Sequence, residues 1–353
     1  MRGGAVSATQ QLKRLPIVRA DFERLLTNSR LKATRRCLRE AKYAYEDGYR
    51  ALAQSENLHL GDLVHKGLEA WWKAATDSER LPAAEVALDA HRAGMDPFMW
   101  AKARVMVVAY HYRWIDEMPK YEVLGVEVEF RAKLRNPETG SSSTVWMLGG
   151  KIDAIVREVA TGRVLIVEHK TSSEDCSPGT DYWKRLRLDA QIGIYYSGAR
   201  SLGHDVEGCL YDVLRKPALR PLQANKSRKD PETPEAYGER CAAAMAEEIG
   251  AYFSRGEVVR LDSEMTELEY DLWQQAATLR EAQRTNRWPK NPDACIRFGY
   301  ECPFWGVCVG EVSLDDPLYF RKLDFVHPEL SPVGSPANEE QNNAASTTES
   351  TAA

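Results

Sequence analysis

Apolar residues recur at helical spacing through the first third of the chain. The pattern predicts a helical stretch from about Asp21 to Leu52, with Ser29 as the expected N-terminal cap. It predicts two further helices over residues 61–75 and 97–115. The chain is therefore expected to begin with a helical layer.

Alternating apolar and polar residues follow and predict three consecutive strands, over residues 121–134, 145–159 and 162–171. Beyond them the pattern predicts in turn a helix, a strand and two more helices, over residues 180–203, 208–217, 234–256 and 266–285. Helices, a run of strands and then helix and strand together are typical of an α/β core with helical additions.

The composition sets the expected domain organisation. The chain has 353 residues, 43% of them hydrophobic, which is enough to bury a core in one large domain or two small ones. We expect a flexible N-terminus over residues 1–20, an ordered domain over 21–326 and a disordered tail over 327–353. The tail is poor in apolar residues and rich in Ser, Thr, Asn, Pro and Ala.

The sequence shows no apolar run long enough to cross a bilayer, and no apolar segment follows the basic residues at its start. These features predict a cytoplasmic protein without a membrane partner. The formal net charge of −5 argues against non-specific coating of nucleic acid, although local basic clusters remain. They could form a binding track if the fold brings them to one cleft: Lys32, Arg35, Arg36, Arg39, Lys42; Lys184, Arg185, Arg187; Arg215, Lys216, Arg220, Lys226, Arg228, Lys229.

The most informative stretch contains two predicted strands around a tight turn near Thr161 and Gly162. Glu168 and Lys170 are two residues apart on the second strand and therefore face the same side of the sheet. Counting back through the turn places Asp153 opposite them. Two carboxylates offer the oxygen ligands that Mg²⁺ or Mn²⁺ prefers, and a lysine beside them can orient a water. The alternative is a surface salt bridge between Glu168 and Lys170.

This order of residues, ID-x14-EHK, resembles the signature of the PD-(D/E)XK nucleases and their RecB-like branch. His65 lies on an upstream helix, where that branch keeps a metal-binding histidine. Gln191 and Tyr195 resemble its Gln-x3-Tyr motif, which contacts the DNA strand. The first half of the signature reads KID rather than Pro-Asp. Glu127 and Glu129, on the preceding strand, are candidate supporting carboxylates, although alternating strand charges usually face solvent.

The resemblance implies a restriction-endonuclease-like core, a mixed sheet flanked by helices, over most of the ordered chain. It also implies a nuclease dependent on Mg²⁺ or Mn²⁺. His65, Asp153 and Glu168 would be metal ligands, Lys170 the cation that orients the water, and Gln191 and Tyr195 contacts to DNA.

Seven cysteines in a cytoplasmic chain argue against a disulfide framework. Three of them, Cys295, Cys302 and Cys308, crowd near the end, one short of the four thiolates of a usual iron–sulfur cluster. Cys37 can supply the fourth, and the iron–sulfur members of this nuclease branch use the same layout of one plus three. The resemblance thus implies a 4Fe–4S cluster that joins the N- and C-terminal helical segments.

Two alternatives for these cysteines are a structural zinc site and free buried thiols. Zinc sites usually show paired, closely spaced cysteines, which this sequence lacks. We expect the remaining three cysteines, Cys176, Cys209 and Cys241, to be ordinary core or loop thiols.

The sequence as a whole predicts a metal-dependent deoxyribonuclease, by resemblance an exonuclease acting on single-stranded DNA ends. Recombination or repair, phage replication and CRISPR adaptation are the pathways that this resemblance allows, with helicase, recombination or CRISPR-adaptation proteins as partners. The alternative is a non-catalytic or endonucleolytic DNA-binding protein of the same fold, with a structural zinc or iron–sulfur site.

Overall fold

The computed structural model describes residues 24–53, 56–225, 229–297 and 299–331. The chain folds into two compact units. We call the unit formed by Ala53–Phe130 and Lys151–Leu268 the central unit. The other, which we call the terminal unit, takes in the chain up to Leu52, Arg131–Gly150 and the chain from Glu269 onward.

A mixed six-stranded sheet has the strand order β1-β4-β5-β6-β7, with β3 paired to β4 outside this path. β5 and β6 run parallel, whereas β4 with β5 and β6 with β7 run antiparallel. β3 and β4 contribute residues to both units. The strands are β1 (Leu25–Leu26), β3 (Tyr121–Arg135), β4 (Ser142–Glu158), β5 (Val164–Ser172), β6 (Val206–Arg215) and β7 (Phe253–Val258).

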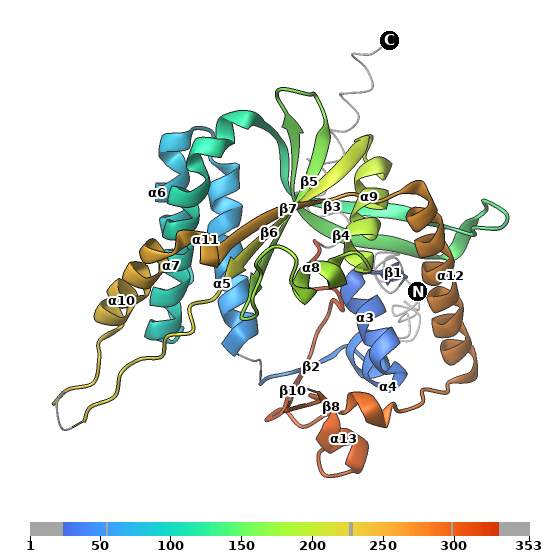
Figure 1. Cartoon of the computed structure of the whole chain (residues 1–353). Coiled ribbons are helices and arrows are strands. Elements are labelled where there is room, and N and C mark those ends of the chain that lie inside the picture. Colours follow the sequence, from blue (N-terminus) through green and yellow to red (C-terminus); the bar gives the residue numbers. More distant parts are fainter. Residues whose placement is uncertain (1–23, 54–55, 226–228, 298, 332–353) are drawn as a thin grey trace, which may run out of the picture. The chain divides into compact units, whose positions relative to one another are not determined.

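Helices flank the sheet in the central unit, with α5, α6, α7 and α10 on one side and α9 on the other (Figure 1). The α/β fold inferred from the sequence, a mixed sheet flanked by helices, is therefore confirmed. The helical elements of this unit are α5 (Glu56–Lys73), α6 (Asp77–Ala90), α7 (Pro97–Trp114), η3 (Ile115–Lys120), α8 (Asp181–Leu186), α9 (Ala190–Ser201), α10 (Pro234–Glu247) and α11 (Ile249–Tyr252). Within the described residues, no helix is both long and apolar enough to span a membrane.

The main core of the central unit lies between the sheet and the larger helical layer. Val64 and Trp71 of α5 are fully buried there, against Val167 of β5 and Leu214 of β6. These side chains recur at helical spacing on α5 and at every second position on the strands, so one stripe of each element faces the core. Burial of such side chains contributes about 1.5–3 kcal/mol each.

The terminal unit is built around short elements from both ends of the described chain. A small core joins Ala33 and Tyr45 to Phe304 and Phe320, whose rings stack at a centroid distance of 5.4 Å. α12 (Asp262–Thr285) begins in the central unit and continues into this one. The other elements are α3 (Asn28–Arg36), α4 (Leu38–Ala41), η2 (Lys42–Glu46), β2 (Tyr49–Ala51), η4 (Pro292–Ala294), β8 (Ile296–Arg297), β9 (Tyr300–Glu301), α13 (Trp305–Val309) and β10 (Phe320–Lys322).

The predicted N-terminal helix differs from the observed structure in two ways. Thr27, not Ser29, caps α3, because its hydroxyl accepts a hydrogen bond from the Arg30 N–H at 3.3 Å. The helix is also broken at Cys37, whose extended backbone (φ −162°) separates α3 from α4. The periodic pattern identified the segment as helical but did not show this break.

Two further predicted helices are divided in the structure. The helix predicted over residues 180–203 becomes α8 and α9, because the Asp189 carboxylate accepts the Gln191 N–H at 2.8 Å and starts a new helix. The helix predicted over 234–256 ends early, and its last residues begin β7, which the sequence pattern missed. α6 was also not predicted.

The packed chain extends past the predicted boundary at residue 327. His327 is fully buried beside the Tyr45 ring, at a centroid distance of 5.5 Å, and Leu330 packs against Leu25. Polar contacts add to these two, because the Thr27 hydroxyl lies 3.4 Å from Nδ1 of His327 and Arg131 donates to the Ser331 carbonyl at 3.2 Å. The predicted flexible segment 1–20 and residues 332–353 of the predicted tail lie outside the described residues.

We expect Leu330→Ala to lower the free energy of unfolding by about 2–3 kcal/mol, because it removes a side chain that is only 6% exposed. Leu318→Ala is the matched control, since Leu318 is 81% exposed. Denaturant unfolding of both variants tests the difference. Equal stability of the two variants would show that the segment after Pro328 does not dock.

Candidate active site

The β4–β5 hairpin brings the predicted carboxylates together in the central unit. Gly162 makes the tight turn with φ +78°, a conformation that favours glycine. The register pairs Ala154 with Val167, so the next pair along is Asp153 with Glu168. The structure therefore places these two residues opposite each other on one face of the sheet, as expected from the sequence.

Asp153 is held by the backbone of the neighbouring strand. Its Oδ2 accepts a hydrogen bond from the His169 N–H at 2.8 Å and lies 3.8 Å from Nδ1 of His65. Burial acts to raise the pKa of Asp153, but its interactions with His65, His169 and Lys170 outweigh this effect and lower that pKa. Asp153 is therefore a carboxylate anion at neutral pH.

Glu168 is the most deeply buried acid of the site, with a side chain only 1% exposed. Its Oε1 accepts hydrogen bonds from the Lys170 ammonium and from Nε2 of Gln191, the latter at 2.7 Å. Its Oε2 is buried and has no hydrogen-bond partner among the described residues. Burial raises the pKa of Glu168 even though Lys170 acts to lower it. A cation at Oε2 would remove this penalty.

α9 supplies the two residues of the predicted Gln-x3-Tyr pair. Gln191 and Tyr195 lie one turn apart, and Nε2 of Gln191 is 2.9 Å from the Tyr195 hydroxyl. α9 also lies very close to Phe130 of β3, because a Cβ on Gly198 would meet the Phe130 ring at 2.5 Å. Glycine at this position lets α9 approach the sheet and place Gln191 against Glu168.

His65 lies on α5 and approaches the Asp153 carboxylate. Its side chain is 31% exposed, and its ring lies 6.4 Å from that of His169. Desolvation lowers the pKa of His65, against the opposing effect of Asp153. The imidazole is therefore neutral at neutral pH, which is the state in which histidine binds a metal.

The donor set at this site suits a hard divalent cation. Asp153 and Glu168 offer carboxylate oxygens, one of them unpartnered, and His65 offers a neutral nitrogen. Within residues 24–53, 56–225, 229–297 and 299–331, however, no three His, Cys, Asp or Glu side chains are gathered closely enough to hold a metal ion. Here the Lys170 ammonium lies against Glu168, so the two carboxylates are not a preformed cage.

A second ion pair borders the site and was not expected from the sequence. Lys151, two residues before Asp153 on β4, pairs with Glu127 of β3. The Glu127 side chain is only 14% exposed, so it does not face solvent as a strand charge usually does. Its backbone has φ +54°, a conformation that costs a non-glycine residue roughly 1–3 kcal/mol. This strain marks the edge of the candidate site.

His169 and Asp212, which lie on the opposite face of the sheet from the carboxylates, were not identified from the sequence. His169, between Glu168 and Lys170, points to the opposite face of the sheet, next to Asp212 of β6. Asp212 is completely buried and interrupts the apolar run of residues 209–214 in β6. An acid within such an apolar run is the sequence signal that could have identified it.

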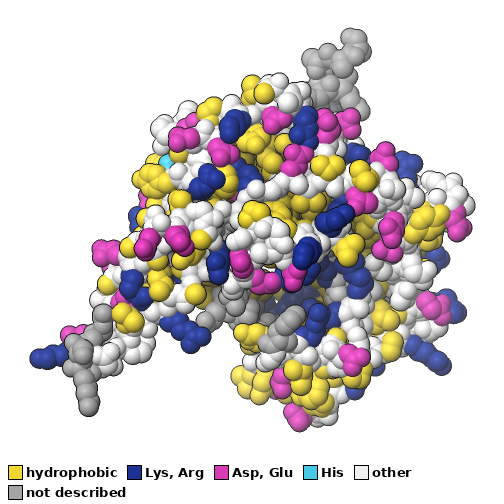
Figure 2. Space-filling model, viewed as in Figure 1, with side chains coloured by type: hydrophobic (Ala, Val, Ile, Leu, Met, Phe, Trp, Pro, Cys, Tyr) yellow, Lys and Arg dark blue, Asp and Glu magenta, His cyan; other side chains and the backbone are white. Residues whose placement is uncertain are grey.

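Many residues of the predicted basic clusters have acidic partners. Lys42 pairs with Asp47 in the terminal unit, and Lys184 pairs with Asp181 in the central unit, both within 2.8 Å. Figure 2 shows Lys and Arg interspersed with Asp and Glu over the face that it draws. Within the described residues these clusters are therefore partly neutralised.

The four cysteines of the predicted cluster all belong to the terminal unit and are half-buried. The Cys302 N–H donates to the Cys295 carbonyl at 2.7 Å. Burial raises the pKa of the Cys308 thiol, and the charges of Cys37 and Cys295 raise it further. Burial raises the pKa of the Cys302 thiol to about 11, and Cys308 also contributes to this increase. The thiols therefore influence one another electrostatically.

Hydrogen bonds hold Cys37 near the C-terminal cysteines. Nε of Arg39 donates to the Trp288 carbonyl at 2.7 Å, and Nδ2 of Asn291 donates to the Arg36 carbonyl at 2.8 Å. These contacts fix the segment on either side of Cys37 against the chain that leads to Cys295. By contrast, the other three cysteines are buried in the central unit: Cys176, Cys209 and Cys241.

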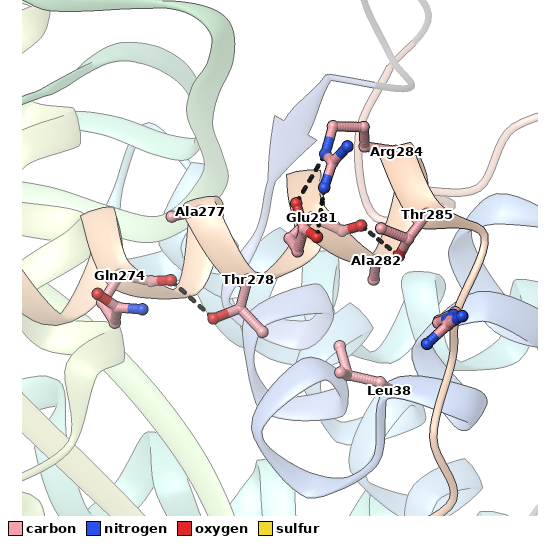
Figure 3. A pocket seen from close by; sticks show the side chains of 9 residues that line it. Leu38, Gln274, Ala277, Thr278, Glu281, Ala282, Arg284 and Thr285 are labelled. Atoms are coloured by element: carbon pink, nitrogen blue, oxygen red, sulfur yellow. Dashed lines mark hydrogen bonds and ion pairs between the residues drawn. The ribbon is translucent and has the colours of Figure 1, made fainter.

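A cavity of about 820 Å³ lies along α12 in the terminal unit (Figure 3). Leu38 and one side of α12 line it. The hydroxyl of Thr285 donates to the Glu281 carbonyl, and Arg284 pairs with the Glu281 carboxylate. These polar groups are therefore paired within the helix.

The comparisons with known proteins begin with two solved structures of low similarity. SSO0001 is 13% identical, with a TM-score of 0.35 over 86% of this chain and 93% of its own. A protein from Eubacterium rectale, described as a candidate exonuclease, is 11% identical, with a TM-score of 0.45 over 89% of this chain and 96% of its own. At these scores neither likeness carries an argument. No curated protein matches the chain.

The family comparison covers far more than the hairpin motif. Residues 26–309 match the family described as the PD-(D/E)XK nuclease superfamily. This span includes the β4–β5 hairpin, α5 with His65, and α9 with Gln191. Because the match extends over most of the chain, the protein belongs to the PD-(D/E)XK nuclease superfamily.

Proposed function

We propose that this protein is a deoxyribonuclease that uses Mg²⁺ or Mn²⁺ to hydrolyse phosphodiester bonds. The observation that supports this most directly is the convergence of Asp153, Glu168 and Lys170 on one sheet face, bordered by Gln191. Family membership supports the same reaction class.

In this proposal Asp153, Glu168 and His65 hold the cation. A divalent cation held there would supply the charge that acidifies a water and stabilises the charge growing on the phosphate. Asp153 is already anionic, and its hydrogen bond from the His169 N–H keeps one oxygen in a fixed direction. Glu168 contributes the unpartnered Oε2.

Lys170 orients the attacking water and screens the phosphate. Glu168 keeps the pKa of Lys170 above its ordinary value, although burial acts to lower it, so the ammonium stays protonated. Its side chain is 32% exposed and can therefore reach a bound substrate. Preorganised donors of this kind contribute about 100-fold or more to rate.

Gln191 and Tyr195 form the wall beside Glu168, and we propose that they contact the DNA strand. The Gln191 amide already donates to Glu168, so a strand held by this residue would lie next to the carboxylates. The substrate that we propose is a single-stranded DNA end, cut exonucleolytically. Recombination or repair, phage replication and CRISPR adaptation are the settings in which such an enzyme would act, together with helicase or other partner proteins.

We further propose that Cys37, Cys295, Cys302 and Cys308 hold a 4Fe–4S cluster in the terminal unit. Two hydrogen bonds support this layout, because those from Arg39 and Asn291 hold the segment around Cys37 against the chain that leads to Cys295. A cluster needs four thiolates at one place. The four thiols would have to draw together around it, because no three His, Cys, Asp or Glu side chains of the described residues are gathered closely enough to hold a metal ion. The cluster would close a loop from Cys37 to the C-terminal segment and so restrict the unfolded chain.

A non-catalytic DNA-binding module of the same fold is the main alternative. Such a module has no need of Asp153, Glu168 and Lys170 together, and their burial and pairing would only cost stability. Their joint presence therefore favours the enzyme.

We expect Asp153→Ala, Glu168→Ala and Lys170→Ala each to lower the cleavage rate by about 100-fold or more, because each removes a ligand or the orienting cation. Cleavage of end-labelled single strands with Mn²⁺ measures this loss. Glu207→Ala and Lys120→Ala, with side chains 56% and 63% exposed, are the matched controls and should cut normally. A wild-type rate in any one of the three site variants would exclude the assigned site.

An exonuclease should degrade linear single strands and leave closed circular strands intact, because it starts from an end. We expect at least about a tenfold difference between the two substrates at equal nucleotide concentration. Gel analysis of a time course with linear and circular forms of one sequence tests this. Circles cut as fast as linear strands would mean that the enzyme is an endonuclease.

Protein purified without oxygen should be brown and contain about four irons per chain. Replacing Cys37, Cys295, Cys302 or Cys308 by alanine should release iron and lower the melting temperature. Cys176→Ala, Cys209→Ala and Cys241→Ala are the controls and should keep the iron content. One zinc in place of iron would refute the cluster, and iron retained in Cys37→Ala would show that another residue is the fourth ligand.

A further inference from the structure

A buried charged network lies behind the candidate active site, on the opposite face of the same sheet. The strand registers pair His169 of β5 with Asp212 of β6, and Asp212 with Arg255 of β7. Three adjacent strands thus carry polar residues at one level of the sheet. The Asp212 and Arg255 side chains are 0% and 7% exposed.

Asp212 is the centre of this network. Its Oδ2 accepts hydrogen bonds from the Tyr110 hydroxyl and from Nη2 of Arg255, both at 2.7 Å, and lies 3.4 Å from Nδ1 of His169. The indole N–H of Trp72 donates to the Tyr110 hydroxyl at 3.2 Å. The Arg255 guanidinium lies 3.8 Å from the centroid of the Trp114 ring.

Burial of these charged groups lowers the stability of the fold. Removing an acid and a guanidinium from water costs several kcal/mol per ion, and apolar residues of similar volume are often as stable or more so. Oδ1 of Asp212 and Nε of Arg255 also lack hydrogen-bond partners among the described residues. Stability alone therefore does not account for this ion pair within the main core.

The network reaches the carboxylates through His169. This residue lies between Glu168 and Lys170, and its backbone N–H donates to Oδ2 of Asp153. Its ring is 3% exposed and is enclosed by Asp212 and by the rings of Trp72 and Tyr110, at centroid distances of 5.7 and 5.8 Å. Neither ring nitrogen has a hydrogen-bond partner among the described residues, so packing and the 3.4 Å approach of Nδ1 to Asp212 hold the ring. A fixed ring fixes the backbone of β5 at the point where the site is built.

We propose that Asp212, held in place by Arg255 and Tyr110, is a positioning residue for the metal site. It anchors the His169 ring, and the His169 backbone then directs the Asp153 and Glu168 carboxylates toward the same point. This inference rests on the proposed function, because it assumes that these carboxylates bind a divalent cation.

The test is Mn²⁺ binding by the full-length protein, measured calorimetrically at a temperature well below the melting transition. Asp212→Asn keeps the shape of the side chain but removes its charge, so it loosens the hold on His169. We expect the Kd for Mn²⁺ to rise about tenfold. In cleavage assays kcat should fall, whereas KM for DNA should be unchanged, because the variant alters no proposed contact to DNA.

Two further variants separate positioning from simple stabilisation. Among the described residues, Asp212→Asn removes the closer of the two ion pairs of Arg255 and leaves only Glu117, at 3.9 Å, so the double variant Asp212→Asn with Arg255→Gln should recover part of the lost melting temperature. Its Mn²⁺ affinity should remain weak, because His169 is still not anchored. If Asp212→Asn does not fold, Tyr110→Phe is the test variant in its place. It removes one hydrogen bond to Asp212 and should therefore also weaken Mn²⁺ binding.

Tyr237→Phe is the matched control. Tyr237 is also a buried tyrosine of the central unit, but its hydroxyl donates to the Leu219 carbonyl at 2.9 Å, outside the network. It should bind Mn²⁺ as wild type does. Wild-type Mn²⁺ affinity in folded Asp212→Asn or Tyr110→Phe would overturn the inference.

Asp153→Asn distinguishes the failure of this inference from the failure of the proposed function. If Asp153→Asn weakens Mn²⁺ binding while the Asp212 variant does not, only the positioning role is wrong. If Asp153→Asn binds Mn²⁺ as tightly as wild type, the proposed metal site is wrong and the positioning role is excluded with it.

Discussion

The pairing of β4 with β5 is the constraint on which the rest of the candidate site depends. A shift of one residue in this register would turn Asp153 to the helical core and separate it from Glu168. The turn at Gly162 and the bond from the His169 N–H to Asp153 both resist such a shift. The other candidate residues are arranged around this hairpin, with α9 on one side of the sheet and α5 on the other.

The charged side chains on the two faces of β5 differ in how far they are buried. Glu168 and Lys170 pair on one face, where the lysine keeps about a third of its surface exposed. His169 and Asp212 meet on the other face, where both are almost fully buried. The exposed face suits groups that must meet a substrate. The enclosed face suits groups that must not move, and the same short strand serves both purposes.

The sequence predicted the hairpin, the three charged residues and the Gln191–Tyr195 pair, because alternation and helical spacing are local properties. It did not predict β7, since the role of Arg255 depends on a partner 43 residues away in the chain, Asp212. It also misjudged the end of the packed chain, where single contacts of His327 with Tyr45 and of Leu330 with Leu25 dock the segment without a periodic pattern. The break at Cys37 was missed because a helical stripe does not reveal a single extended residue.

The terminal unit is assembled from segments that leave the ribosome at very different times. The central unit has all of its residues once the chain has been made to Leu268. Ala33 and Tyr45 are synthesised early, yet their core partners Phe304 and Phe320 come last. During translation the apolar side chains of Ala33 and Tyr45 therefore stay exposed until Phe304 and Phe320 have been synthesised. Nascent chains with such exposed apolar surface are prone to aggregate and are bound by chaperones.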